Sequence, residues 1–384
     1  MDIVKRLILK TIFMCLRVFR IKNNKIVITS FYGKGYGDNS KYICNEILNR
    51  DLNLDIVWLV NDLNCKFPDG IRKVKFKSLK SFYELATAKI WIDNSRKHDY
   101  ILKRKSQYYI QTWHSSLRLK KIEGDAINEL PKDYVRNAKL DSKKMNLLTV
   151  GCRFSEEMYN RAFWYSGEMM RCGTPRCDLF FNETVAQKIK KDICTNYNIN
   201  DKKIILYAPT FKKNYVTDDV SIDFEKIISE LNSPNEKYVF FVRLHPISQK
   251  KFVSTENAFD FTNYPDMQEL ISICDYFITD YSGCCFDAMI AKKPCVLYTP
   301  DLEVYLKNER SLCFDFNDLP FEKIKTSNDL ISSIKNFNYE KYYDDINNFQ
   351  DYIGSYENGN ASKLIADRIE KIINEGDEIK HEKV

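Results

Sequence analysis

The sequence predicts an α/β protein built from two doubly wound parallel sheets. Short runs of apolar and β-branched residues alternate with longer segments of helical spacing, which is typical of parallel α/β folds. The short runs are apolar nearly throughout, as expected of parallel strands that helices cover on both faces. The chain has 384 residues, and this length suits about two domains.

The predicted strands fall into two sets, one in each half of the chain. Segments with helix-like spacing, such as 39–49, 224–231 and 282–291, lie between them. We place the strands at Lys25–Phe31, Asp55–Val60, Lys89–Asp93, Tyr108–Trp113 and Leu147–Val150, and then at Lys203–Tyr207, Tyr238–Arg243, Tyr276–Thr279 and Cys295–Tyr298.

The predicted domain boundary lies within 170–200. There the run Cys-Gly-Thr-Pro at 172–175 breaks the chain, and a charged helix follows before a new strand begins. Because open α/β sheets bind ligands at the carboxyl ends of their strands, we expect the site in a cleft between the domains. The expected segments are a basic amphipathic membrane-associating helix at 1–24, an acceptor domain at 25–170, a donor domain at 171–358, and a C-terminal helix and tail at 359–384.

Composition narrows the possible classes of protein. With 44% hydrophobic residues the chain can bury substantial cores, so global disorder is excluded. The net charge of +6 suits a protein that handles phosphates or approaches an anionic surface, and it does not indicate nucleic-acid binding. The 12 cysteines are scattered and form no C-x-x-C motif, which favours a reduced, cytosolic protein over a zinc-binding one.

The N-terminal segment combines basic and apolar residues at nearly helical spacing. No apolar run approaches the ~18–20 residues that cross a bilayer, and Lys10 and Arg17 interrupt any signal-peptide core. We expect an interfacial helix on anionic lipid at the cytoplasmic face of the cell membrane. The alternative is an ordinary helix that covers a domain. The basic residues are Lys5, Arg6, Lys10, Arg17, Arg20, Lys22 and Lys25, and the only acid is Asp2.

Two of the four histidines directly follow predicted strands, one in each half of the chain. His114 ends the run QTWH, and His245 follows Phe240–Leu244. A histidine at the carboxyl end of a strand stands where α/β enzymes place reacting groups, and an ordinary pKa of about 6.5 allows acid or base catalysis. The alternative is a structural histidine that hydrogen-bonds to the backbone.

Three polar turns are candidate phosphate sites, at 282–283, 208–211 and 173–176. After the strand ending at Thr279, Ser282 and Gly283 begin a predicted helix whose N–H groups suit a diphosphate, although serine and glycine also serve as plain helix caps. Further along this helix, Asp287 is a candidate acceptor for hydroxyl groups. Arg176 and Arg243 are candidate clamps because guanidinium binds phosphate bidentately.

Several familiar motifs are missing. The glycines within 33–38 do not have dinucleotide-binding spacing. No D-x-D triplet occurs, so the carboxylate pair of many metal-dependent sugar-nucleotide transferases is absent, and no Walker A loop, G-x-S-x-G or H-E-x-x-H occurs. We therefore expect neither a metal nor a cofactor.

Taken in order, the motifs resemble the CDP-glycerol glycerophosphotransferase family of teichoic-acid and capsule synthesis. The resemblance covers about residues 25–310 and is far more specific than any single motif. The matching runs are GYGDNS at 35–40, QTWH at 111–114, LKKI at 119–122, RAFWY at 161–165, GTPRCD at 173–178, ILYAPTF at 205–211, RLHP at 243–246, ITDYSGCCFD at 278–287, KKP at 292–294 and LYTPDLEVY at 297–305.

This resemblance implies two Rossmann-like domains facing a cleft, the GT-B arrangement. It also implies metal-independent transfer of a polyol phosphate from CDP-glycerol or CDP-ribitol to a hydroxyl of a lipid-linked glycan or polymer, with release of CMP. By position, the implied donor contacts are His114, Ser115, Ser116, Leu117, Arg118, Arg176, Pro209, Thr210, Arg243, Leu244, His245, Ser282, Gly283 and Asp287.

The predicted mechanism is attack of the acceptor hydroxyl on phosphorus. His114 acts as general base, while His245 and Arg243 stabilise the diphosphate and the departing CMP; the sequence does not order the two histidines, and their roles could be exchanged. Ser115, Arg118 and Gly283 depart from the family's usual residues. Two alternatives stay open, namely a GT-B glycosyltransferase that uses a nucleotide sugar and a catalytically inactive membrane-bound binding module.

Overall fold

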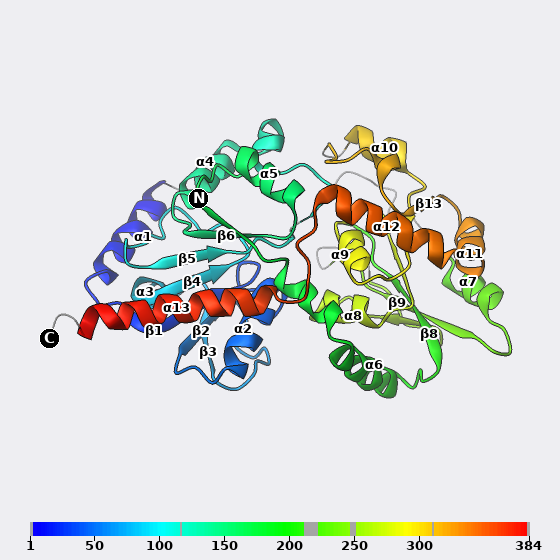
Figure 1. Cartoon of the computed structure of the whole chain (residues 1–384), viewed down its shortest axis with the longest axis horizontal. Coiled ribbons are helices and arrows are strands. Elements are labelled where there is room, and N and C mark those ends of the chain that lie inside the picture. Colours follow the sequence, from blue (N-terminus) through cyan, green and yellow to red (C-terminus); the bar gives the residue numbers. More distant parts are fainter. Residues whose placement is uncertain (1–2, 116, 211–221, 246–250, 309–310, 382–384) are drawn as a thin grey trace. The chain divides into compact units, whose positions relative to one another are not determined.

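The computed structural model describes residues 3–115, 117–210, 222–245, 251–308 and 311–381. Each of two compact units contains one parallel sheet (Figure 1). Unit 1 comprises residues 1–116, 122–178 and 355–384, and unit 2 comprises residues 117–121 and 179–354. The predicted site residue Ser116 and the ends of two motifs, Phe211 and Pro246, lie outside the described residues.

Unit 1 contains a seven-stranded sheet in the order β3-β2-β1-β4-β5-β6-β7, with every neighbouring pair parallel. Strand β1 is buried on both faces, as the apolar sequence predicts. The strands are β1 (Lys22–Thr29), β2 (Asp55–Val60), β3 (Ile71–Lys75), β4 (Ala88–Asp93), β5 (Tyr108–Gln111), β6 (Leu147–Val150) and β7 (Glu168–Arg171).

Helices cover this sheet and complete its core. Ile26 and Ile28 of β1 pack with Ile43 of α2 and Ile365 of α13, while Val27 faces the opposite side of the sheet. Helix α3 contacts β1, β3 and β4. The helices are α1 (Ile3–Leu16), α2 (Asp38–Asn49), α3 (Leu79–Thr87), α4 (Lys132–Ser142), α5 (Arg153–Ala162) and α13 (Ala361–His381), with 3-10 helices η1 (Glu123–Glu129) and η2 (Pro175–Phe181), the last of which reaches the boundary of unit 2.

Unit 2 contains a six-stranded parallel sheet in the order β10-β9-β8-β11-β12-β13. Numbered from its own first strand, this order is 3-2-1-4-5-6, the Rossmann arrangement. The strands are β8 (Lys202–Tyr207), β9 (Lys237–Val242), β10 (Ala258–Asp260), β11 (Tyr276–Thr279), β12 (Cys295–Tyr298) and β13 (Glu322–Ile324).

The helices of unit 2 bury apolar faces against this sheet. Ile205 of β8 shares a core with Ile227 of α7 and Leu330 of α11, and α9 contacts β11 and β12. The helices are α6 (Glu183–Tyr197), α7 (Phe224–Leu231), α8 (Met267–Ile273), α9 (Cys284–Ile290), α10 (Leu302–Asn308), α11 (Ser327–Lys335) and α12 (Tyr339–Ile353), with the 3-10 helix η3 (Phe316–Asp318).

The N-terminal helix is shorter than the predicted 1–24 segment. Helix α1 ends at Leu16, and β1 begins at Lys22. Lys25, which we grouped with the surface-facing bases, is instead buried, with its Nζ 2.5 Å from Glu84 Oε2. The segment joining helix to strand is held in place, because Arg104 donates to the backbone oxygens of Arg17 and Phe19. Only the first part of the predicted segment is therefore a helix.

The C-terminal helix belongs with the first sheet. Residues 355–384 cluster with unit 1, together with residues 171–178, which the sequence analysis assigned to the second domain. Arg368 of α13 pairs with Glu168 at 2.7 Å, and Arg50, which directly follows α2, donates to the backbone oxygen of Lys363 at 3.0 Å. Unit 1 is thus completed by two segments from beyond the expected boundary.

Candidate functional site

Each sheet has a point where its strand order reverses, between β1 and β4 in unit 1 and between β8 and β11 in unit 2. Parallel strands end at the same edge of a sheet, and open α/β sheets bind ligands where the order reverses. The predicted histidines follow strands at these edges, His114 after β5 and His245 after β9. The described site is therefore two groups of residues, one in each unit.

The half-buried imidazole of His114 has a defined hydrogen bond. Its Nδ1 lies 3.1 Å from the backbone oxygen of Asn94, which follows β4. Because a carbonyl oxygen only accepts, Nδ1 carries the proton in neutral histidine and Nε2 carries the lone pair. The rings of Phe31 and Trp113 lie 5.6 and 4.4 Å from the imidazole. This arrangement suits a general base that acts through Nε2.

Arg176 is engaged with the protein around His114. Its Nη1 lies 2.8 Å from Asp38 Oδ2 and also donates to the backbone oxygen of His114. The other Asp38 oxygen accepts from Asn94 Nδ2 at 2.9 Å. The Arg176 side chain is buried among these groups. The contacts give Arg176 a role in holding His114, besides the phosphate contact that the resemblance implies.

The segment after His114 joins the two groups along the chain. The backbone oxygen of Ser115 accepts from Tyr159 Oη at 3.1 Å in unit 1. Leu117 and Arg118 belong to unit 2, where the next residue, Leu119, accepts from the backbone N–H of Cys313 at 2.7 Å. A Cβ built on Gly283 would lie 3.8 Å from the Arg118 Cα, so two of the three positions that depart from the family's usual residues are neighbours.

In unit 2 the carboxylate of Asp280 ties two strand ends together. Its Oδ1 accepts from the backbone N–H groups of Thr210 and Tyr281, at 2.8 and 2.6 Å. Thr279 Oγ1 donates to the backbone oxygen of Ala208 at 2.6 Å across the same reversal point. The turns that contain Pro209–Thr210 and Ser282–Gly283 are thereby fixed at one edge of the sheet.

Arg243 is a half-buried cation at this edge, and its Nη1 is buried. Its backbone N–H donates to Tyr207 at 2.9 Å, which puts it beside the end of β8. Among the described residues, the buried Nη1 of Arg243 and the buried Oγ1 of Thr210 have no hydrogen-bond partner. Burial lowers the pKa of the Arg243 guanidinium, and Cys284 and Asp266 only partly offset this. A buried donor without a partner is costly, so the position favours an anionic ligand.

The remaining predicted residues of unit 2 have protein contacts. Leu244, between Arg243 and the half-buried His245, donates its N–H to Thr262 Oγ1 at 3.2 Å. Ser282 Oγ accepts from the backbone N–H of Cys284, the first residue of α9, at 3.3 Å. Asp287, the candidate acceptor for hydroxyl groups, is 4% exposed and accepts from Gln268 Nε2 at 3.1 Å, so its carboxylate is buried and already has a protein donor.

Three site residues escaped the sequence reasoning. Asp38 and Asn94 surround His114, and Asp280 joins the donor-side turns. Asn94 and Asp280 each stand directly after a strand, and this position was an available signal. The sequence signal for Asp38 was weaker. Asp38 begins α2 with a φ of +57°, and this feature is visible only in the backbone geometry.

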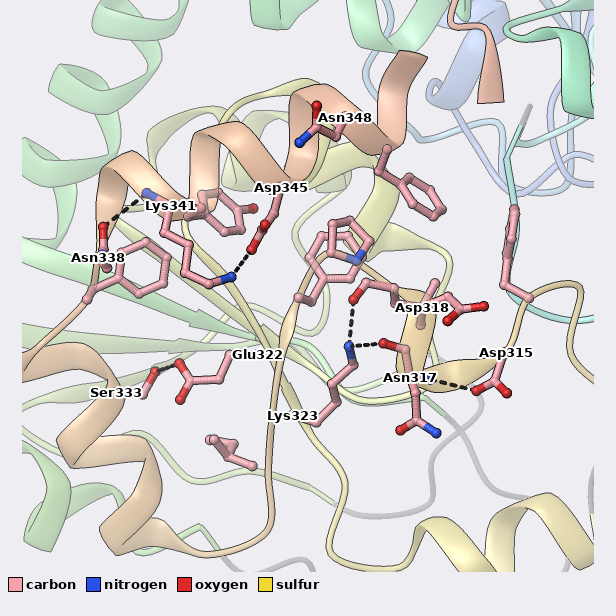
Figure 2. Close-up of a pocket in the computed structure, with 18 of the residues that line it drawn as sticks. Asp315, Asn317, Asp318, Glu322, Lys323, Ser333, Asn338, Lys341, Asp345 and Asn348 are labelled. Atoms are coloured by element: carbon pink, nitrogen blue, oxygen red, sulfur yellow. Dashed lines mark hydrogen bonds and ion pairs between the residues drawn. The ribbon is translucent and has the colours of Figure 1, made fainter. Parts of the chain in front are cut away.

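A large cavity of about 1230 Å³ lies elsewhere in unit 2, beside β13 and α12 (Figure 2). None of the predicted site residues lines it. Its lining includes five carboxylates and two lysines, Asp315, Asp318, Glu322, Asp329, Asp345, Lys323 and Lys341. An excess of negative charge disfavours a diphosphate, so we do not place the donor there.

The described residues show neither a metal-binding cluster nor a membrane-spanning helix. Within the described ranges, no group of three or more histidine, cysteine, aspartate or glutamate residues is arranged to hold a metal ion. Over the same part of the chain, no helix has the length and apolar character needed to cross a membrane.

Known proteins resemble this chain over nearly its whole length. Residues 10–371 match the family described as CDP-glycerol:poly(glycerophosphate) glycerophosphotransferase. A teichoic acid poly(glycerol phosphate) polymerase from Staphylococcus epidermidis is 32% identical over 92% of the chain, and the chain spans 52% of that relative's length. A teichoic acid glycerol-phosphate primase from Bacillus subtilis is 33% identical, with 77% of each chain covered.

Solved structures agree with these matches. A histidine variant of the wall teichoic acid polymerase TagF superposes with a TM-score of 0.87 at 30% identity, covering 97% of both chains. A second histidine variant, soaked with CDPG, gives a TM-score of 0.86 at 29% identity, with coverages of 97% and 96%. The two-sheet architecture is therefore that of a GT-B-like fold.

Proposed function

This chain belongs to the CDP-glycerol:poly(glycerophosphate) glycerophosphotransferase family, and from that premise we propose that it transfers a polyol phosphate from a CDP-alditol to a hydroxyl of a lipid-linked glycan or polymer. Glycerol phosphate is the group that we propose first, and CMP is the released product. The chain spans about half the length of the first relative it matches, so its own activity, donor and acceptor are parts of the proposal.

The half-buried Arg243, with its buried Nη1, carries the donor assignment. It directly follows β9, beside the end of β8, and one of its nitrogens lacks a partner in the described part of the chain. A CDP-alditol brings a diphosphate, whose oxygens would satisfy that nitrogen and the nearby Thr210 hydroxyl. Ser282, Gly283 and His245 follow strands at the same edge, and we assign them to the diphosphate and the departing CMP.

His114 supplies the base. The acceptor oxygen attacks the phosphorus that bears the alditol, the bond from that phosphorus to the CMP oxygen breaks, and the hydroxyl proton passes to Nε2 of His114. The Nδ1 contact with the Asn94 backbone oxygen supports this direction, because it leaves Nε2 with the lone pair. General base catalysis of this kind typically contributes about 10²–10⁴-fold. We propose that this reaction uses neither a metal ion nor a cofactor.

We further propose that α1 holds the protein on the cytoplasmic face of the cell membrane as a peripheral protein. Phe13 packs into unit 1 against Phe82, so one face of the helix is occupied. Leu7 and Ile8 are 64% and 54% exposed and, with Val4 and Met14, form an apolar stripe on another face. Lys5 and Lys10 are also exposed. An exposed apolar stripe beside basic residues suits anionic lipid, where a lipid-linked acceptor would lie.

Replacing Arg243 tests the donor site. Arg243→Gln removes the charge but keeps a hydrogen-bonding side chain, and we expect at least ~10-fold weaker CDP-glycerol binding in calorimetric titration, since charge-assisted hydrogen bonds contribute about 1.5–3 kcal/mol. Lys203→Gln, which breaks an exposed ion pair with Glu236 in the same unit, is the control and should bind normally. Equal affinity of the Arg243→Gln variant and the wild type would overturn the assignment.

A further inference from the structure

We infer that Asp38 is a positioning residue for the His114 base, an inference that rests on the proposed function. Asp38 has no place in the donor contacts that the family resemblance implies. It lies at the start of α2, remote in sequence from His114, and its carboxylate connects the two groups that hold that histidine.

The first connection runs to the imidazole. Asp38 Oδ1 accepts from Asn94 Nδ2 at 2.9 Å, and the backbone oxygen of Asn94 accepts from His114 Nδ1 at 3.1 Å. Asn94 is completely buried, and its Oδ1 also accepts from the Phe31 N–H at 2.8 Å. These hydrogen bonds orient the Asn94 side chain. They thereby fix the Asn94 backbone oxygen, which accepts the hydrogen bond from His114 Nδ1.

The second connection runs to the backbone of His114. Asp38 Oδ2 lies 2.8 Å from Arg176 Nη1, which also donates to the His114 backbone oxygen. The next residue, Asn39, reinforces this link: its Oδ1 accepts from the Arg176 backbone N–H at 3.1 Å, and its Nδ2 donates to the Trp113 oxygen at 2.9 Å. A single carboxylate thus orders both the ring and the main chain of His114.

The backbone around this network is strained, which suggests that the network holds it. Asp38 has φ of +57° and Trp113 has φ of +51°. Residues with side chains adopt this left-handed region at a cost of about 1–3 kcal/mol, and such strain persists only when the surroundings over-determine it. Asp38 and Arg176 are 8% and 7% exposed, so loss of the carboxylate removes a 2.8 Å ion pair from a largely buried guanidinium.

Asp38→Asn tests the inference, because it keeps the shape of the side chain but loses the charge. We expect kcat for CMP release from CDP-glycerol to fall at least ~10-fold, as partial loss of a general base predicts, with KM for the donor within about twofold. Asn94→Ser removes the hydrogen bond from Asn94 Nδ2 to Asp38 but leaves the Asp38–Arg176 pair and the Asn94 backbone oxygen, and it should behave likewise. The control is Asp125→Asn, which removes a 2.8 Å pair with Arg161 on the surface of the same unit and should leave kcat unchanged.

A spectroscopic readout separates positioning from general damage. ¹⁵N NMR of the imidazole, assigned with His114→Gln, should show Nδ1 protonated in the wild type and a mixture of tautomers in Asp38→Asn or Asn94→Ser. A wild-type ring protonated on Nε2, or folded variants that keep both the wild-type tautomer and kcat, would overturn the role of Asp38. Failure of the proposed function is distinct, because the wild type then releases no CMP from a CDP-alditol, whatever the tautomer.

Discussion

At the scale of single residues, the two strand-end histidines carry the proposed chemistry. His114→Ala and His245→Ala should each lower kcat at least ~100-fold, because each removes a group that acts on the transition state. His98 is a matched control in unit 1, since it is half-buried and stacks on Tyr100 with ring centroids 5.1 Å apart. His98→Ala should keep kcat within about twofold. Steady-state CMP release measures all three, and near-normal turnover of His114→Ala would disprove the base assignment.

A second residue-scale prediction concerns stability. Burial raises the pKa of Asp141 to about 6, although Lys144 and Arg96 act in the opposite direction, and its Oδ1 has no hydrogen-bond partner among the described residues. The pKa of Asp141 is higher in the folded protein than in the unfolded one, so protonated Asp141 favours folding. Its contribution to the free energy of unfolding is present below about pH 4 and is lost as the pH rises through about 6. Asp141→Asn should therefore stabilise the protein increasingly from pH 4 and level off above pH 7, by at most about 3 kcal/mol.

Urea unfolding of Asp141→Asn and the wild type across this pH range provides the measurement. The relevant quantity is the difference in free energy of unfolding between the two proteins, since other groups titrate in both. A difference that does not change between pH 4 and 8 would contradict the raised pKa.

The sequence identified the strand-end histidines and Arg243 but not the residues that hold them. His114 and His245 were visible because their positions follow apolar runs. Asp38 meets Arg176 across 138 positions, and no local pattern encodes that pair. Burial of Asp287 was equally hidden, since its partner Gln268 comes from another helix.

At the scale of elements, helix α1 is unusual because several of its apolar side chains are exposed. Leu7→Glu and Ile8→Glu change exposed side chains and leave the packed Phe13 in place. We expect the double variant to lose binding to phosphatidylglycerol vesicles, because it removes apolar side chains that would be buried in the membrane. It also adds two negative charges beside the basic residues, each of which contributes about 1 kcal/mol to binding near anionic lipid. Binding of the wild type should weaken as salt is added. Vesicle co-sedimentation measures both effects.

The matched control for this surface is Val253→Glu, since Val253 is an exposed apolar residue of unit 2. It should sediment with vesicles as the wild type does. If the wild-type protein ignores anionic vesicles at low salt, α1 is only a covering helix, as the alternative interpretation holds.

The central strands of each sheet were predictable from the sequence, and the edge strands were not. All nine predicted strands are present, and the four unpredicted ones, β3, β7, β10 and β13, are the edge strands of the two sheets. An edge strand has one neighbour and needs less apolar sequence. Strand β3 reads IRKVK and buries only Val74, and β7 reads EMMR with no fully buried residue. A search for continuous apolar runs misses such strands.

At the scale of the whole molecule, domain membership follows packing rather than chain order. The C-terminal helix α13 packs on α2 and β1, and its apolar face was predicted. The sequence did not predict which sheet this apolar face packs against, because either sheet offers apolar surface. The parallel order of both sheets was predictable from the alternation of elements, and the reversal points within them locate both groups of candidate residues.

The most direct test of the central claim is a donor comparison. The full chain is incubated with a lipid-linked acceptor and, separately, with CDP-glycerol, CDP-ribitol and a panel of UDP-sugars, and the released nucleotide is quantified. We predict acceptor-dependent CMP release from a CDP-alditol, fastest with CDP-glycerol, and no UDP release. Release of UDP with no CMP would identify a glycosyltransferase, and absence of any nucleotide release would identify a binding module; either result contradicts the account.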